Sequence, residues 1–172
     1  GDPRNRFQVL TDYKKSNIDA VPSINSLSSL TSEIKKGKLE RTFYPISGIS
    51  NQLTVNCNEG GYWSTYQSDK YGFNNPNYAY NSESIDAILV GDSFVLGNCV
   101  SQGEDIASHL RKLNINVLNM GYAANGPLTE LATIIEYGSK IKPNNVFWFY
   151  FRGDMEDLQK ELMGNFLYKY FS

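Results

Sequence analysis

Three mainly apolar runs in the second half of the chain constrain its fold more than any other feature. They span Ile85 to Val90, Ile115 to Met120 and Val146 to Phe151. Short apolar runs bounded by turn residues are typical of parallel strands, which other elements cover on both faces. The sequence therefore predicts an α/β core built on a parallel sheet. We expect the run that begins at Val146 to be a central strand, buried on both faces.

Helical spacing follows the first two runs, as a parallel sheet requires. Ile106, Leu110 and Leu113 recur at the spacing of one helix face, and we expect them to face the sheet. Pro127 is suited to the first turn of the next helix. The predicted apolar face of that helix consists of Leu128, Leu131, Ile134 and Ile135. Another short helix is predicted from Thr31 to Gly37.

The first half of the chain is more polar and contains a predicted β-hairpin. Gln52 to Asn56 and Tyr62 to Tyr66 have strand character, and Asn58-Glu59-Gly60-Gly61 between them is a good hairpin turn. We therefore expect the chain to have two parts. These are an N-terminal extension over residues 1–80, which packs on the core, and an α/β core over residues 81–172.

The first apolar run ends abruptly in Gly91-Asp92-Ser93. Ligands and catalytic groups gather at the carboxyl ends of the strands in open α/β sheets. A serine at this edge can point its hydroxyl into a cleft, with backbone N–H groups close by to hold an oxyanion. Gly, Asp and Ser are also common turn formers, so the trio by itself indicates only a turn. Its position in the predicted sheet, together with later parts of the chain, favours a nucleophile.

The Gly91-Asp92-Ser93 segment and two later segments together resemble the conserved blocks of one enzyme family. The stretch Gly91-Asp92-Ser93-Phe94-x-x-Gly97 resembles block I of the SGNH (GDSL-type) hydrolases. Asn119 to Pro127 resembles block II, and Arg152-Gly153-Asp154 stands where block III usually has Gly-Asn-Asp. The stretch from Asp69 to Pro76 is similar to a segment that precedes block I in a bacterial, exported or membrane-anchored subset of these proteins. The resemblance extends from Ile85 to Leu162.

The resemblance implies a three-layer α/β/α fold with a parallel sheet, similar to that of flavodoxin. It also implies hydrolysis of an ester, or transfer of an acyl group, through Ser93 and without a cofactor. The backbone N–H of Ser93, the block II backbone and the block III Asn would form the oxyanion hole, and Asp92 would orient the loop. The substrate would be a small ester or an acylated glycan, such as an acetylated one. Family membership further implies an extracytoplasmic location, compatible with a membrane anchor outside this chain.

The chain departs from the family pattern at three points. Ala124 replaces a block II glycine, although Gly121 and Gly126 lie on either side of it. Gly153 or Asp154 stands in place of the block III Asn, and an ionised Asp154 would repel an oxyanion. The C-terminal Asp-x-x-His of the family is absent from these residues, so we expect the natural protein to continue. The alternative hypothesis is a non-catalytic SGNH-like domain that binds a polysaccharide or a protein partner.

Other features of the sequence exclude several classes of function. The formal net charge of -2 offers no electrostatic basis for binding nucleic acid. The single histidine, His109, is predicted to lie on the helix that leads away from Ser93, which disfavours it as the catalytic base. One histidine and no acidic cluster also predict no metal site. No glycine-rich loop follows the first strand, which disfavours nucleotide binding. Cys57 and Cys99 form either a disulfide or two separate buried thiols, and the sequence leaves both open.

Overall fold

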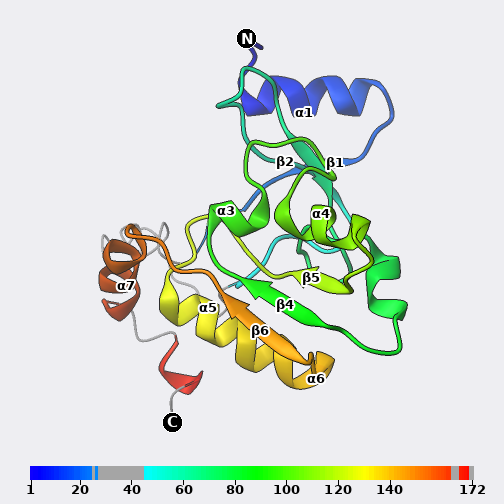
Figure 1. Ribbon diagram of the computed structural model, residues 1–172. Coiled ribbons are helices and arrows are strands. Elements are labelled where there is room, and N and C mark those ends of the chain that lie inside the picture. The colour runs from blue at the N-terminus through cyan, green and yellow to red at the C-terminus, as the bar shows by residue number, and fades with distance from the viewer. Residues whose placement is uncertain (25, 27–44, 164–166, 171–172) are drawn as a thin grey trace.

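The structure is a computed structural model that describes residues 1–24, 26, 45–163 and 167–170 (Figure 1). It is a mixed α/β fold with two small sheets. The elements in chain order are α1 (Arg6–Lys15), β1 (Ala20–Pro22), β2 (Leu53–Val55), β3 (Thr65–Gln67), η1 (Asn77–Asn81), β4 (Ala87–Val90), α3 (Ser93–Leu96), α4 (Ile106–Lys112), β5 (Val117–Asn119), α5 (Pro127–Thr133), η2 (Ile134–Gly138), α6 (Ser139–Ile141), β6 (Asn145–Trp148), α7 (Asp154–Leu162) and η3 (Tyr168–Tyr170). The helix predicted from Thr31 to Gly37 lies outside the described residues.

The three apolar runs form a parallel sheet in the order β5-β4-β6, as the sequence predicts. The prediction that the third run is a central strand is wrong. The central strand is β4, all four residues of which are buried, whereas all four residues of β6 are exposed. Each side chain from Val146 to Phe151 is between 40% and 58% exposed. β6 lies at the edge of the sheet among the described strands, and none of its side chains belongs to the buried clusters on the two sides of β4.

Alternate residues of β4 point into two separate hydrophobic clusters. Ile88 and Val90 pack with Leu118 and Phe73, and Tyr137 of η2 lies against this cluster. On the other side, the cluster comprises Ala87, Leu89, Val95, Ala107 and Val117. Helical segments therefore pack on both faces of the parallel sheet at its central strand. The carboxyl end of β4 lies between these two packed layers.

The predicted apolar faces of the two intervening helices differ from the observed buried faces. On α4 the fully buried residue is Ala107, while Ile106 is 38% exposed and Leu113 is 70% exposed. The short side chain of Ala107 lets the helix pack closely against β5. On the next helix, Pro127 begins α5 as predicted. The fully buried residues of α5 are, however, Thr129, Glu130, Ala132 and Thr133 rather than the predicted leucines and isoleucines.

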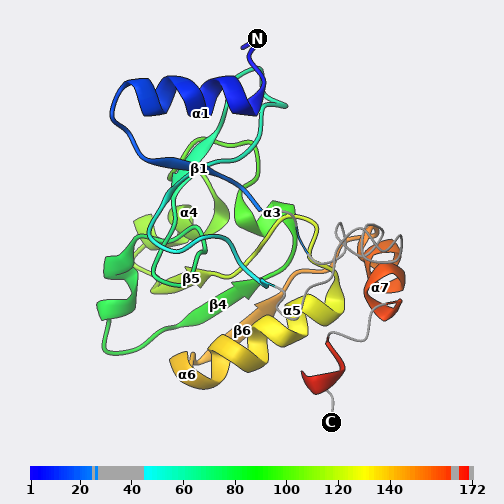
Figure 2. The ribbon, with the colours of Figure 1, turned by 180° about the vertical axis from the view of Figure 1, so that it is seen from behind.

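The second sheet comes from the N-terminal part and has the order β1-β2-β3. Figure 2 shows its strand β1 between α1 and the parallel sheet. β2 and β3 pair antiparallel, which confirms the predicted hairpin, although β3 begins at Thr65 rather than Tyr62. β1 adds to this hairpin in parallel with β2. No helix in the described part of the chain has the length and apolar character that crossing a membrane requires.

Candidate functional site

Ser93 lies at the first turn of α3, directly after the carboxyl end of the central strand β4 (Figure 1). Asp92 is the N-cap of α3, and its Oδ1 accepts a hydrogen bond of 2.9 Å from the Phe94 N–H. The Ser93 hydroxyl donates to Asp92 Oδ2 over 3.5 Å. Asp92 is therefore engaged in shaping the loop, the role that the sequence predicts for it.

The loop from Asn119 to Pro127 is held against α3 by the buried side chain of Asn119. Its Nδ2 donates to the Val95 carbonyl at 2.6 Å, and its Oδ1 accepts from the Gly121 N–H at 2.9 Å. A Cβ on residue 121 would lie 2.5 Å from the Leu96 nitrogen, so only glycine allows this close approach. The Gly121 N–H is used within the loop, which removes it as a donor to a substrate.

Ala124 has a backbone φ of 58°, in the left-handed region. Glycine adopts this conformation without strain, whereas the Cβ of an L-residue crowds the following carbonyl. The loop therefore has the backbone shape that suits a glycine at position 124, although the residue is alanine. At Gly153 the φ is −66°, which any residue can adopt.

The loop from Asp69 to Pro76 contacts both α3 and the segment that begins at Asn119. Asp69 is fully buried, and its carboxylate accepts from the backbone N–H groups of Tyr71 and Phe73 and from the side chains of Asn75 and Tyr80. Burial raises the pKa of Asp69, and these hydrogen bonds oppose that shift.

Two neighbouring asparagines of this loop reach the candidate site. Asn74 Nδ2 donates to the Leu96 carbonyl at the end of α3. Asn75 accepts from the Asn119 N–H at 2.7 Å and donates to the Asn119 carbonyl at 2.7 Å. Arg111 of α4 donates to the Asn75 Oδ1 at 3.1 Å. The loop therefore connects α3 to Asn119 through the side-chain amides of Asn74 and Asn75.

α5 and α7 carry buried carboxyl groups. Glu130 of α5 is 1% exposed, and its Oε2 accepts from the Trp148 Nε1–H at 2.6 Å. Its Oε1 has no hydrogen-bond partner among the described residues. Burial raises the pKa of Glu130 to about 8, and the nearby Asp154, Asp92 and Glu161 carboxylates add to the shift. The neutral acid is therefore its main form at pH 7.

Asp154 is the first residue of α7, and its Oδ2 accepts from the Phe151 N–H at 2.5 Å. It is 2% exposed, and burial raises its pKa, with Asp92 adding to the effect. The Phe151 ring, three residues earlier, lies 5.1 Å from the ring of Phe94 between centroids. This contact joins the segment that leads into α7 to the residue that follows Ser93.

Glu161 of α7 caps the start of α5. Its carboxylate accepts from the backbone N–H groups of Gly126, Leu128 and Thr129, and from the Thr129 hydroxyl. These N–H groups have no partner within the helix, so their hydrogen bonds favour the carboxylate, but burial is the larger effect and raises the pKa of Glu161. Sequence reasoning missed Glu130, Glu161 and Asn75. Each of the two glutamates is a charged residue within a helix, next to apolar positions. A pattern based on apolar residues alone does not predict that such a residue is buried.

His109 does not join this site. Its Nε2 lies 3.2 Å from a Glu104 carboxylate oxygen, and both side chains are more than half exposed. Three cavities of about 370, 410 and 830 Å³ are lined by other residues than Ser93. Asn74 and Pro76 line the first of them, together with Arg111 and Lys112 of α4.

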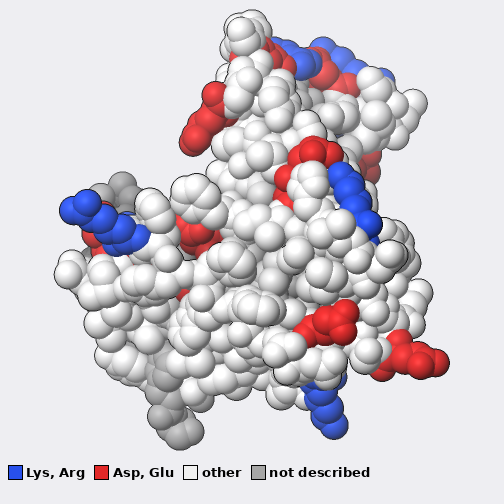
Figure 3. All heavy atoms as spheres, in the orientation of Figure 1, with Lys and Arg blue, Asp and Glu red and all other residues white. Residues whose placement is uncertain are grey.

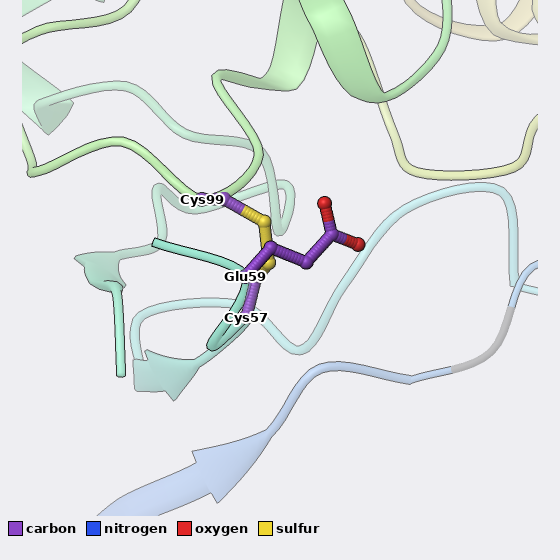
Figure 4. A group of neighbouring side chains, drawn as sticks. All are labelled: Cys57, Glu59 and Cys99. Atoms are coloured by element: carbon purple, nitrogen blue, oxygen red, sulfur yellow. A yellow bond between two sulfur atoms is a disulfide. The ribbon is translucent and has the colours of Figure 1, made fainter. Parts of the chain in front are cut away.

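Cys57 and Cys99 form a disulfide, which decides between the two alternatives that the sequence leaves open (Figure 4). These cysteines and Glu59 are also a group of potential metal ligands brought together in the described part of the chain. Because the two sulfur atoms are bonded to each other, no thiolate is present to bind a metal. The disulfide joins the loop between β2 and β3 to the loop after α3.

No family model, no curated protein and no solved structure matched the chain.

Proposed function

We propose that this chain carries the nucleophile of an SGNH-type serine esterase or O-acyltransferase, and that Ser93 is this nucleophile. The observation that supports the proposal most is the position of Ser93, in the first turn after the carboxyl end of the buried central strand. In open α/β sheets this edge is where ligands bind. The helical segments on both sides of β4 support, in addition, a three-layer α/β/α arrangement.

The reaction begins with attack of the Ser93 hydroxyl oxygen on an ester carbonyl. A base takes the hydroxyl proton, and the carbonyl oxygen becomes an oxyanion held by N–H donors, the Ser93 N–H among them. The tetrahedral intermediate then expels the alcohol, which takes up the proton, and an acyl-serine remains. Water or a sugar hydroxyl accepts the acyl group in the second step. Hydrolysis and transfer therefore share one acyl-enzyme, and a small ester or an acylated glycan serves as substrate.

Asp154 has the chemistry to replace the block III Asn as a donor. Burial raises its pKa, which favours the neutral carboxylic acid. A neutral acid has an O–H that can donate a hydrogen bond, whereas the ionised form would repel the oxyanion. The proposed role of Asp154 therefore depends on its proton.

Two further parts of the proposal concern location and the alternative function. A disulfide persists in oxidising compartments, which supports an extracytoplasmic location. The pairing of His109 with Glu104, away from Ser93, favours the second candidate function, a non-catalytic domain that binds a polysaccharide or a protein.

Labelling with a fluorophosphonate, followed by peptide mapping, tests the nucleophile. We expect Ser93 to react faster than Ser101, an exposed serine that serves as an internal control. Added imidazole can act as the base, so it should accelerate labelling of Ser93 more than labelling of Ser101. Asp154→Asn should retain the Ser93 rate and Asp154→Ala should lower it. Equal labelling of the two serines, with and without imidazole, would rule out the enzyme and favour the binding domain.

A further inference from the structure

A cavity of about 370 Å³ lies beside α4, in a part of the molecule that the proposed chemistry of Ser93 does not use. Its walls come from α4, from the turn that precedes this helix, and from η1 with the residues that lead into it. Its volume falls within the range of small-molecule sites. Among its lining residues are Asn74, Pro76, Tyr78, Gln102, Arg111 and Lys112.

One wall of the cavity offers an apolar surface. Tyr78 is 70% exposed, and Pro76 on the same wall is half-buried. The Tyr78 hydroxyl hydrogen-bonds to no other described residue, so its ring is available to a ligand. Tyrosine combines a large apolar ring with a polar tip, and this ring can stack on the C–H face of a ligand.

Side-chain amides face the cavity from the polar walls. Asn74 donates from Nδ2 to the Leu96 carbonyl at 2.9 Å, which leaves its Oδ1 as an acceptor. Gln102 is exposed, and its side-chain amide hydrogen-bonds to no other described residue. An amide supplies donors on its nitrogen and an acceptor on its oxygen. Such groups match ligand hydroxyls, each of which both donates and accepts.

The two basic side chains of the cavity already have acidic partners. Lys112 Nζ lies 3.2 Å from Glu104 Oε1, and the Arg111 guanidinium lies 4.0 Å from Asp105 Oδ1. Figure 3 shows basic and acidic atoms side by side on the face where α4 lies in the same view of Figure 1. Arg111 also donates to Asn75 Oδ1, which holds the guanidinium in place. The cavity therefore offers fixed N–H donors without an excess of positive charge that would attract an anion.

We propose that this cavity binds one neutral sugar residue of a glycan. A sugar ring has C–H faces that pack on an aromatic ring, and Tyr78 with Pro76 suits these faces. Its hydroxyl groups need both donors and acceptors, which the Asn74 and Gln102 amides supply. The paired charges disfavour a phosphate or a carboxylate as the occupant, and the polar walls disfavour an apolar molecule.

The proposed sugar site is separate from the candidate oxyanion hole. Ser93, Ala124 and Asp154 do not line the cavity, so the inference does not rest on Ser93 being a nucleophile. Asn74 nevertheless connects the two regions, because the Leu96 carbonyl to which it donates belongs to α3, the helix that begins at Ser93. An esterase and a non-catalytic domain would both gain affinity for a glycan from this cavity.

Titration of the isotope-labelled full chain with neutral sugars, followed by amide NMR spectra, tests the proposal. The probes are D-glucose, D-galactose, D-mannose and N-acetyl-D-glucosamine. At least one of them should shift the amide resonances of Tyr78, Gln102 and Gly103 with a millimolar Kd. Added salt should leave this Kd unchanged, since no net charge takes part in the binding. The proposal is overturned if no sugar shifts these resonances, or if inorganic phosphate binds there more tightly and loses affinity with salt.

Substitutions in the cavity wall distinguish binding there from binding elsewhere. Tyr78→Ala and Gln102→Ala should each weaken the affinity about tenfold with an unchanged circular dichroism spectrum, because both side chains are exposed. The controls Tyr168→Ala and Gln67→Ala remove exposed side chains of the same types outside the cavity and should keep the affinity. Ser93→Ala should keep it too, which separates failure of this site from failure of the proposed function. Unchanged affinity in both cavity variants would overturn the proposal.

Discussion

Single residues near Ser93 are held in states that their side chains do not favour. Ala124 has a left-handed backbone, and Glu130 keeps a carboxyl group in a nearly dry position. The loop between β5 and α5 imposes the left-handed backbone of Ala124. The packing of α5 beneath β6 buries the Glu130 carboxyl group. Because each has a definite physical cause, each leads to a prediction about one substitution.

Ala124→Gly should stabilise the protein. The left-handed conformation costs an L-residue about 1 kcal/mol or more, whereas glycine adopts it freely. Glycine also loses more entropy on folding, which offsets part of the gain. We expect a net increase of up to about 1 kcal/mol in the free energy of unfolding, measured as a higher denaturant midpoint at an unchanged slope.

The matched control for this prediction is Ala123→Gly. It makes the same substitution one residue earlier, at a position outside the left-handed region. The control should lower stability or leave it unchanged, because glycine relieves no strain there. If Ala124→Gly were no more stable than Ala123→Gly, the left-handed conformation would not be a source of strain.

Glu130 should make stability depend on pH. The folded protein keeps the Glu130 proton up to a pKa of about 8, whereas the unfolded chain releases it near the ordinary value of 4.5. The unfolded state therefore loses a proton first, and stability falls as pH rises through this window, at up to about 1.4 kcal/mol per pH unit for one group. Asp69, Asp154 and Glu161 have raised pKa values and act in the same direction.

Glu130→Gln should therefore flatten the fall in stability between pH 5 and pH 8. The variant keeps an acceptor for the Trp148 N–H but has no carboxyl proton to lose. The free energy of unfolding, measured by denaturant titration at each pH, gives the slope directly. Glu136→Gln removes a half-exposed carboxylate from η2, which directly follows α5, and should keep the original slope. Parallel slopes for both variants would contradict the assignment.

Among the elements, the sequence predicts those that depend on local signals. The three strands, the start of α5 at Pro127 and the hairpin of β2 and β3 follow from apolar runs, a proline and turn residues. The position of β6 was predicted wrongly because an apolar strand is typical of burial on both faces. Whether another strand pairs with it depends on chain topology, which a local pattern does not contain.

The buried faces of α4 and α5 could not be predicted from periodicity alone. On α5, Thr129 and Glu130 are buried because Glu161 and Trp148 supply hydrogen-bond partners from distant parts of the chain. A polar residue becomes suitable for burial only when such a partner exists. Ser93 and Asp92, by contrast, lie where the sequence places them, because a strand followed by Gly-Asp-Ser determines its own turn.

The loop from Asp69 to Pro76 gives a prediction at this scale. Asn75→Ala removes the partners of the Asn119 N–H and carbonyl, and one donor to Asp69. Leaving buried polar groups without partners costs about 1–3 kcal/mol for each group. We expect a loss of at least about 2 kcal/mol in unfolding free energy, and faster amide exchange in β5 and in the block II loop.

Asn77→Ala is the control for this substitution. Asn77 also hydrogen-bonds, to Lys70 and Asn51, but it is exposed to water that can replace those partners. Its loss should therefore cost less than about 1 kcal/mol. A similar loss for both variants would mean that the Asn75 bridge does not hold β5 and the loop in place.

At the scale of the whole molecule, the two sheets are connected by few but specific contacts. The Tyr122 hydroxyl, from block II, bonds to both the N–H and the carbonyl of Ile24, just after β1. The Asn125 side-chain Nδ2 donates to the Ile46 carbonyl at 3.3 Å, and the disulfide joins Cys57 to Cys99. The N-terminal sheet is thereby fastened to the loops around Ser93, on which the proposed chemistry depends.

Reduction of the disulfide should therefore weaken the connection between the two sheets. The bond closes a loop with a sequence separation of 42, and in the chain-entropy model it stabilises the folded state by about 3–4 kcal/mol. We expect the denaturant midpoint to fall by a corresponding amount in the presence of a reductant. The double variant Cys57→Ser and Cys99→Ser should show the lower midpoint with and without reductant, which separates loss of the bond from other effects of the reagent. An unchanged midpoint on reduction would mean that Tyr122 and the other contacts hold the N-terminal sheet to the Ser93 loops without the covalent link.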